Sequence, residues 1–519
     1  MTSGEAGLHI LAKPQPEEYR VKSTSIINAP RISLKDVGLL LLLTCGAILV
    51  HGYHPYVEDA EIYVPGIKKI LNPALYPYNQ GFFASHARLT LFPNLIAGSI
   101  KSSHLPVDWG LALWHFASVF LLLLACWHLG RLAFRDPAAK WGGVALVASL
   151  LTIPVAGTAL YIMDQYLNPR SLSTPAVLFI IINVIEHRFV RAVLWTLFTA
   201  AIHPLMIVFG VTYAVILLGM QRSERQSLRS SQSAAAVAAF LPLGLFPPVT
   251  DAYREVLDKH PEFFLMRWQW YEWLGLVAPI GLLWWFSRIA GQKQLPTLRL
   301  LCRALAMFQL FFLVLSLAIT VPARFANFAE LQPMRSLHLT YVMLFGFAGG
   351  LLAQFLLRDR WWRWLLLFAP LCAGMYFAQR ELFPATPHIE WPGGASGRND
   401  WVAAFQWIRR NTPLDAYFAL NPEHMEVAGE DYHGFRAIAE RSMLADRVKD
   451  SGVVTMFPAM GAAWQEQVRA QNGWRNFQAK DLLALQQRFG VNWVVLEEPA
   501  LPSLNCPYKN PAVLVCRLN

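Results

Sequence analysis

The chain has 519 residues, of which 55% are hydrophobic, 13% aromatic and only 15% charged, and its mean hydropathy is +0.35. A soluble globular protein carries about 25% charged residues, so this composition excludes an ordinary soluble enzyme and indicates a protein whose main solvent is lipid. The net charge of +10 does not indicate nucleic-acid binding, because the basic residues lie between apolar runs and not among stacking aromatic residues on a polar domain.

The first apolar run, at residues 36–52, follows a polar leader of residues 1–33. No small-residue cleavage site follows this run, so we interpret it as a retained membrane span and not as a cleaved signal peptide. A membrane span needs about 20 apolar residues. Further runs of this kind lie at 109–131, 141–162, 234–250, 271–288, 300–321, 336–357 and 361–379.

The segment 172–220 is apolar on both sides of "EHRFVR", and its second part is about one and a half spans long. His203-Pro204 lies in the middle of that part, and proline ends or kinks a helix. Basic loops collect on the cytoplasmic side of a membrane. All basic loops of this chain fall on the cytoplasmic side only if 191–203 and 204–220 are two short helices that meet at His203-Pro204 on the outer side. This count predicts about eleven transmembrane helices, with the N-terminus in the cytoplasm and the C-terminus outside.

The first outer loop, residues 53–108, opens with three carboxylates, Glu58, Asp59 and Glu61, directly after the first span. Such a cluster suits a general base, and the Asp59-x-Glu61 spacing could hold a divalent ion through oxygen ligands. If a short helix runs through 57–63, Glu58 and Asp59 point about 100° apart and Glu61 shares the face of Glu58. The alternative is a solvated loop without a catalytic role.

Basic side chains occur in every predicted outer segment. An ionisable residue at the membrane surface suggests a function, and the arginine fork matches phosphate oxygens. We therefore predict a phosphate site at headgroup level, with the candidates Arg170 in "MDQYLNPRSLST", Arg324 and Arg335 in "PARFANFAELQPMRSLH", His203, and Arg88 of the first loop. The alternatives are that the arginines anchor to lipid headgroups or cap a helix and that His203 caps a turn.

The composition changes near residue 381, where the Pro/Gly-rich junction "PATPHIEWPGGASGRND" begins. Polar helices are predicted at 399–411, 459–471 and 478–489, and strands at "YFAL", "FRAIA", "VNWVVLEE" and "AVLVCRL". Helices alternating with strands predict a small α/β domain over 381–519, on the outer side. In that oxidising compartment Cys506 and Cys516 could form a disulfide across the last hairpin; the alternative is two free thiols.

The chain resembles the GT-C superfamily of membrane glycosyltransferases, which includes the protein O-mannosyltransferases and the lipid A aminoarabinose transferases. The resemblance covers residues 34–380 and is carried by the placement of "GYHPYVEDAEIYVPGIKKIL", "LNPRSLSTPAVLF", "AAIHPLM" and "FAELQPMRSLHL". It implies an all-α polytopic membrane protein of the cell (inner) membrane. The reaction it implies is sugar transfer from a polyprenyl-phosphate donor to a glycan, lipid or protein acceptor on the outer face.

In this scheme one carboxylate of the first loop takes the proton of the acceptor hydroxyl, and the arginines stabilise the departing phosphate. Glu58-Asp59-Ala60-Glu61 stands where the family has Asp-Asp, Asp-Glu or Asp-x-Asp, so the choice of acid stays open, with Asp59 first and Glu58 next. Two alternatives remain. One is a transporter or flippase for a lipid-linked or anionic solute, although matching halves are not evident. The other is an inactive scaffold whose outer domain is the working part.

Overall fold

The computed structural model describes residues 32–226, 250–321, 328–394, 398–497 and 504–518. Its contacts divide the chain into two units, Met1–Leu39 and Leu40–Asn519. In the first unit the described residues form the start of helix α1 (Leu34–His51). The second unit contains the rest of the described chain, including the whole candidate site.

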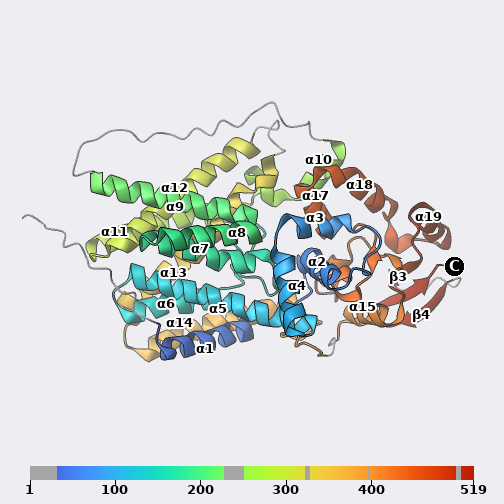
Figure 1. Cartoon of the computed structure of the whole chain (residues 1–519), viewed down its shortest axis with the longest axis horizontal. Helices are drawn as coiled ribbons and strands as arrows, with labels where there is room; N and C mark the ends of the chain where they lie inside the picture. Colours follow the sequence, from blue (N-terminus) through green and yellow to red (C-terminus); the bar gives the residue numbers. More distant parts are fainter. Residues whose placement is uncertain (1–31, 227–249, 322–327, 395–397, 498–503, 519) are drawn as a thin grey trace, which may run out of the picture. The chain divides into compact units, whose positions relative to one another are not determined.

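Long apolar helices make up the larger part of the second unit (Figure 1). Neighbours along the chain pack together, as α5 does with α6 and α11 with α12, and α6 also packs against the distant α13. The bounds are α5 Val107–Ala133, α6 Pro137–Ser149, α7 Pro169–Ile185, α8 Phe189–Ile202, α9 Pro204–Gln226, α11 Trp270–Gln292, α12 Pro296–Thr320, α13 Ser336–Leu352 with a π-helical turn Ala353–Leu357, and α14 Trp361–Leu382.

Six helical segments in the described part of the chain are long and apolar enough to cross a membrane. They are Leu34–His51, Val107–Ala133, Pro204–Ser223, Trp270–Gln292, Pro296–Thr320 and Phe328–Leu357, and each overlaps a span predicted from the sequence. The helices α7 and α8 are apolar but shorter, and α14 is not among the six. The predicted span 234–250 lies outside the described residues except for its last residue. A multi-pass membrane protein is therefore supported, whereas the count of eleven spans is not.

Two details of the predicted helices are wrong. The predicted span 141–162 is helical only to Ser149, because the chain then turns toward Pro154, which has no N–H to donate and restricts the residue before it. The predicted break at His203-Pro204 is confirmed, since α8 ends at Ile202 and α9 begins at Pro204, but α9 has 23 residues and is not a short helix. Pro204 is the first residue of α9, a position where its missing N–H costs nothing.

The contact between α6 and α13 shows how apolar helices pack without a hydrophobic driving force. A Cβ at Gly143 would lie 2.5 Å from the carbonyl oxygen of Gly346, and one at Gly142 would lie 2.5 Å from that of Gly349. Small residues at such positions let two backbones approach closely, which favours helix association in lipid.

The first loop folds into three short helices, α2 (Ala60–Leu71), α3 (Gly81–Leu89) and α4 (Phe92–Ser103). The apolar face of α2, with Val64 and Ile67, packs against Phe92 and Ile96 of α4 in one buried cluster. Another short amphipathic helix, α10 (Asp251–Asp258), leads into two 3₁₀ turns, Pro261–Phe263 and Leu265–Arg267.

The C-terminal part contains a five-stranded mixed sheet in the order β2-β1-β3-β5-β4. The strands β1 and β2 are parallel to each other, β1 is parallel to β3, and β5 runs antiparallel to both β3 and β4. The bounds are α15 Asp400–Asn411, β1 Tyr417–Ala419, α16 Phe435–Ala439, β2 Ser442–Met443, α17 Lys449–Met456, α18 Gly461–Ala470, α19 Ala479–Phe489, β3 Trp493–Glu497, β4 Asn505–Lys509 and β5 Val513–Arg517.

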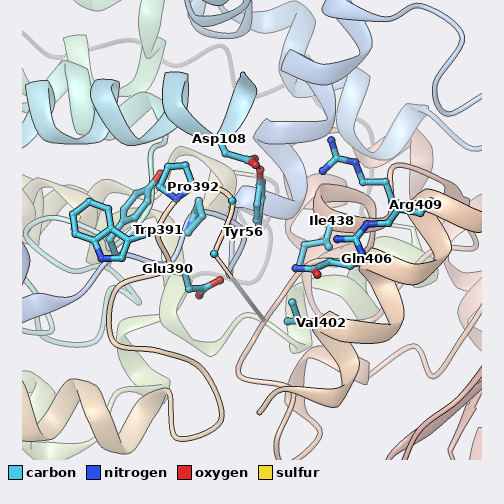
Figure 2. A pocket seen from close by; sticks show the side chains of 14 residues that line it. Tyr56, Asp108, Glu390, Trp391, Pro392, Val402, Gln406, Arg409 and Ile438 are labelled. Carbon is cyan, nitrogen blue, oxygen red and sulfur yellow. The ribbon is translucent and has the colours of Figure 1, made fainter. Parts of the chain in front are cut away.

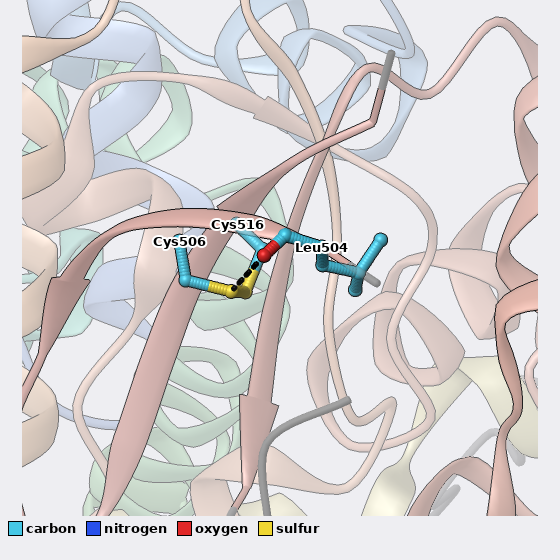
Figure 3. Close-up of a disulfide and its surroundings, with 3 residues drawn as sticks. All are labelled: Leu504, Cys506 and Cys516. Carbon is cyan, nitrogen blue, oxygen red and sulfur yellow. Dashed lines mark hydrogen bonds between the residues drawn. A yellow bond between two sulfur atoms is a disulfide. The ribbon is translucent and has the colours of Figure 1, made fainter. Parts of the chain in front are cut away.

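A disulfide joins Cys506 of β4 to Cys516 of β5 (Figure 3). The predicted helices of this region correspond to α15, α18 and α19, and three predicted strands correspond to β1, β3 and β5. The fourth predicted strand, "FRAIA", is wrong, because these residues form the helix α16. A carboxylate from the first loop caps this helix: Glu61 accepts the backbone N–H groups of Arg436 and Ala437, each at 2.9 Å. These are first-turn donors that a helix leaves unpaired.

Further contacts attach the C-terminal part to the first loop. The Lys68 ammonium donates to the Ala437 carbonyl at 2.7 Å and forms an ion pair with Glu440 at 2.7 Å. The Tyr76 hydroxyl donates to the Arg436 carbonyl at 2.9 Å. Lys68 and Tyr76 are buried, so leaving their polar groups without hydrogen-bond partners would destabilise the fold. The two regions therefore hold each other in place around the candidate site.

Candidate functional site

A cavity of about 350 Å³ lies where the first loop meets the ends of several helices. Four elements supply five of its charged side chains. Glu58 and Asp59 come from the turn before α2, Arg170 from the first turn of α7, Arg335 from the turn before α13, and Lys449 from the start of α17. The cavity therefore brings together two of the three predicted acids and two of the predicted arginines, which are separated by up to about 280 positions in the sequence.

The two acids Glu58 and Asp59 point into this cavity together. α2 begins only at Ala60, and Glu58 has a left-handed backbone with φ 55°. The expected divergence of the two side chains within a helix is therefore wrong. Their carboxylates instead meet at the Lys449 ammonium, which contacts Glu58 Oε2 and lies 3.2 Å from Asp59 Oδ1. Both side chains remain about one third exposed, at 36% and 35%.

The pKa of Asp59 reports the charges around it. Burial would raise this pKa, but the positive charges of Lys449, Arg170 and Arg335 together lower it to about 2. Asp59 is therefore ionised at every physiological pH, and the arginines of the cavity are close enough to influence it.

Glu61 belongs to a different part of the structure. Its side chain is fully buried, does not line the cavity, and contacts Arg436 in addition to capping α16. Burial raises the pKa of Glu61, and the charge of Arg436 opposes this. Because Asp59 and Glu61 have different partners, this pair does not form one cation site. Within the described ranges, no group of three or more His, Cys, Asp or Glu side chains could hold a metal ion.

Arg170 and Arg335 both line the cavity. Arg170 forms an ion pair with Asp164 at 2.5 Å, and its buried Nε has no hydrogen-bond partner. In the part of the chain that the structure describes, no carboxylate lies within ion-pair distance of Arg335. The buried Gln332 Oε1 beside it also has no partner. Two guanidinium groups with unused donors facing one cavity are suited to an anion.

A second cavity of about 260 Å³ adjoins the first, and Asp59, Ile62, Gln332, Arg335 and Gly452 line both. Its remaining lining is mainly apolar and aromatic: Tyr63, His86, Leu89, Thr90, Pro169, His203, Pro204, Leu205 and Met456. The predicted residue His203 therefore lies beside the apolar cavity. Asp59 and Arg335 stand at the border between a polar and an apolar space.

Two predicted phosphate ligands are not part of this arrangement. Arg88 is exposed and lines neither cavity. Arg324 lies outside the described residues. Conversely, the sequence analysis missed Lys449 and Gln332. Lys449 lies 390 positions from Asp59 in a polar helix, and no local pattern distinguishes it from a surface lysine.

Another cavity, of about 360 Å³, lies between the junction 390–394 and α15 (Figure 2). Figure 2 shows Trp391 and Pro392 on one side, Gln406 and Arg409 on the other, and Tyr56 with Asp108 between them. Its acids already have partners within the protein. Asp108 accepts from the Tyr56 hydroxyl, and Glu390 accepts from His54 at 2.7 Å and from His433 at 3.0 Å. We place the candidate site at the cavity of Asp59 instead, because that cavity contains Arg170 and Arg335 and adjoins an apolar cavity.

Neither a protein-family model nor a curated protein matches the chain. Among solved structures, the chain is similar to the Archaeoglobus fulgidus oligosaccharyltransferase in two states. The apo form gives 12% identity and a TM-score of 0.32, and the form tethered by a disulfide to an acceptor peptide with the NVT sequon gives 13% and 0.37. Both matches cover 89% of this chain and 69% of the other. At such identities and TM-scores, fold and function have to be argued from this chain's own residues.

Proposed function

We propose that the chain is a membrane glycosyltransferase that moves a sugar from a polyprenyl-phosphate donor to an acceptor on the outer face of the membrane. One observation carries the proposal. The carboxylate of Asp59 and the guanidinium of Arg335 stand at the border of a polar and an apolar cavity, and Arg170 lines the polar one. A lipid-linked phosphosugar has the same three parts: an apolar chain, an anion and a polar sugar.

The phosphate binds between Arg170 and Arg335. Arg335 has no competing carboxylate among the described residues, so its fork is available to two phosphate oxygens. As the bond from the anomeric carbon to the phosphate oxygen breaks, negative charge grows on that oxygen, and both guanidinium groups stabilise it. The prenyl chain extends into the apolar cavity beside Leu89, Leu205 and Met456.

Asp59 acts as the base, because it lines both cavities whereas Glu58 lines only the polar one. A carboxylate with a pKa of about 2 is a weak base. Donor binding changes this, since the phosphate neutralises the positive charges of Arg170 and Arg335 that lower the pKa of Asp59. The acceptor proton is therefore taken more readily when the donor is in place.

The location on the outer face follows from the distribution of basic loops. If the leader is cytoplasmic, the first loop, the start of α7, the turn at His203 and the turn before α13 all open to the outer side. The disulfide between Cys506 and Cys516 also suits an oxidising compartment.

Mass spectrometry of cell-surface glycans tests the proposal. A deletion strain should lose one glycan modification that the parent gene restores. Asp59→Asn keeps size and hydrogen bonding but removes the proton-accepting charge, and should lower restoration by about 10²-fold. Glu58→Gln should cost less. Asp258→Asn is the matched control, because Asp258 is exposed and its one ion-pair partner among the described residues is Arg267.

The same variants separate transfer from transport. Loss of the glycan in Arg335→Lys combined with full restoration by both Asp59→Asn and Glu58→Gln would indicate binding or transport without bond breakage. An unchanged glycan profile in the deletion strain would contradict the proposal as a whole.

A further inference from the structure

The carboxylate pair of the candidate site already contains a cation. The Lys449 ammonium contacts Glu58 Oε2 and lies 3.2 Å from Asp59 Oδ1, and its side chain is only 14% exposed. Burial lowers the pKa of Lys449, but the two carboxylates outweigh this and raise it above its ordinary value. The lysine is therefore charged, and it occupies the place between two acidic side chains where a hard cation would otherwise bind.

The position of Lys449 is set by buried contacts of its own helix. Asp446 precedes α17 and accepts the backbone N–H of Lys449 at 2.5 Å and that of Asp450 at 3.1 Å. Asp450 in turn forms two hydrogen bonds to Arg436, at 3.0 and 2.6 Å. Arg436 also contacts Glu61 at the start of α2, directly after the acid pair. One buried network of hydrogen bonds and ion pairs therefore fixes the backbone of Lys449 relative to the Glu58–Asp59 pair.

The charges that line the cavity leave little need for a further cation. Four carboxylates face three permanent positive charges, and two of the carboxylates have other partners. Asp164 is paired with Arg170, and Glu262 accepts from His260 at 2.8 Å. The remaining pair, Glu58 and Asp59, meets Lys449, with the charges of Arg170 and Arg335 nearby. A divalent ion would have to displace Lys449 and approach these two guanidinium groups, which is electrostatically unfavourable.

We propose that Lys449 is the resident cation of the Glu58–Asp59 pair, so that the C-terminal domain completes the site and the pair does not recruit a divalent ion from solution. Lys449 is a positioning residue: it directs both carboxylates into the cavity. What the directed carboxylates do there rests on the proposed function, but occupancy of the pair by lysine does not. The C-terminal domain thereby contributes to the site, because its helix α17 supplies the cation.

Binding of Mn²⁺ to the purified full-length protein in detergent tests the inference without any donor or acceptor. The free ion gives a six-line electron paramagnetic resonance spectrum that is lost on binding. The parent protein should bind no Mn²⁺ at the pair up to about 1 mM, the weak end of carboxylate sites. The Lys449→Gln variant should gain one Mn²⁺ site whose dissociation constant lies at least about 10-fold below 1 mM. The double variant Lys449→Gln, Glu58→Gln should lack this site. Lys449→Arg should keep the ion out.

Two results would overturn the inference. One is a parental Mn²⁺ site that Glu58→Gln abolishes, which requires no Lys449 variant to fold. The other is a folded Lys449→Gln protein, with parental thermal stability, that gains no site. The glycan assay is separate. Lys449→Gln should lose transfer and Lys449→Arg should restore part of it. If the parent gene restores no glycan, the proposed function fails while the Mn²⁺ result still decides the role of Lys449.

Discussion

Replacing Glu61 by alanine tests whether the acids of the first loop have separate roles. Glu61 accepts two backbone N–H groups of α16 and contacts Arg436, and all of these groups are buried. The replacement leaves two buried donors unpaired, at about 1–3 kcal/mol each, or about 2–6 kcal/mol together. The total stability of a domain is about 5–15 kcal/mol, so this is a large loss. Glu58→Ala, three positions earlier, removes one partly exposed ion pair and should cost at most about 1 kcal/mol.

Hydrogen–deuterium exchange of the detergent-solubilised protein measures this difference locally. A loss of about 2 kcal/mol or more should accelerate exchange of the amides of residues 435–440 by about 30-fold or more, since 1.4 kcal/mol corresponds to a factor of ten. Glu58→Ala should leave this segment near its parental rate. Parental exchange at 435–440 in Glu61→Ala would refute the view that a loop carboxylate holds α16. Equal acceleration in both variants would show that the acids act as one cluster.

Four further predictions can be tested separately. Gly434→Ala should lower the melting temperature by an amount similar to Glu61→Ala, because a Cβ there would lie 2.2 Å from the capping carboxylate; an unchanged melting temperature would contradict the close approach. Arg335→Lys should lower glycan transfer strongly in a protein that still inserts, while Arg254→Lys, an exposed control, should not. The pKa of Asp59 is lowered to about 2 in the donor-free protein, and kcat/KM reports the pKa values of the free protein, so kcat/KM for transfer should stay constant as the pH falls from 7 to about 4; kcat should fall at a higher pH, because bound phosphate raises this pKa. A loss of kcat/KM already near pH 5 would point to another base. Reporter fusions at Gln226 and Gly394 should indicate opposite sides of the membrane, and like results would remove the basis for placing the site outside.

Local sequence determined the features that depend on short stretches of chain. Apolar runs of about 20 residues predict the long helices because a helix satisfies all of its backbone hydrogen bonds within one segment, as lipid requires. The change of composition near residue 381 predicted the mixed helices and strands that follow. The same stretches also indicated Asp59, Arg170 and Arg335 as candidate site residues, because a charged residue at the end of an apolar run costs free energy and therefore suggests a function.

Tertiary structure alone decided how the three acids of "EDAE" differ. Glu58 and Asp59 face a cavity and a lysine 390 or 391 positions away, whereas Glu61 is buried against a segment 375 or 376 positions away. That distant carboxylate also caps the helix that "FRAIA" forms, although its residues suggest a strand. A carboxylate has the same local pattern whether it becomes a base, an ion-pair partner or a helix cap. The difference lies in which donors the folded chain places within about 3 Å of its oxygens, and those donors come from parts of the sequence that no local pattern connects.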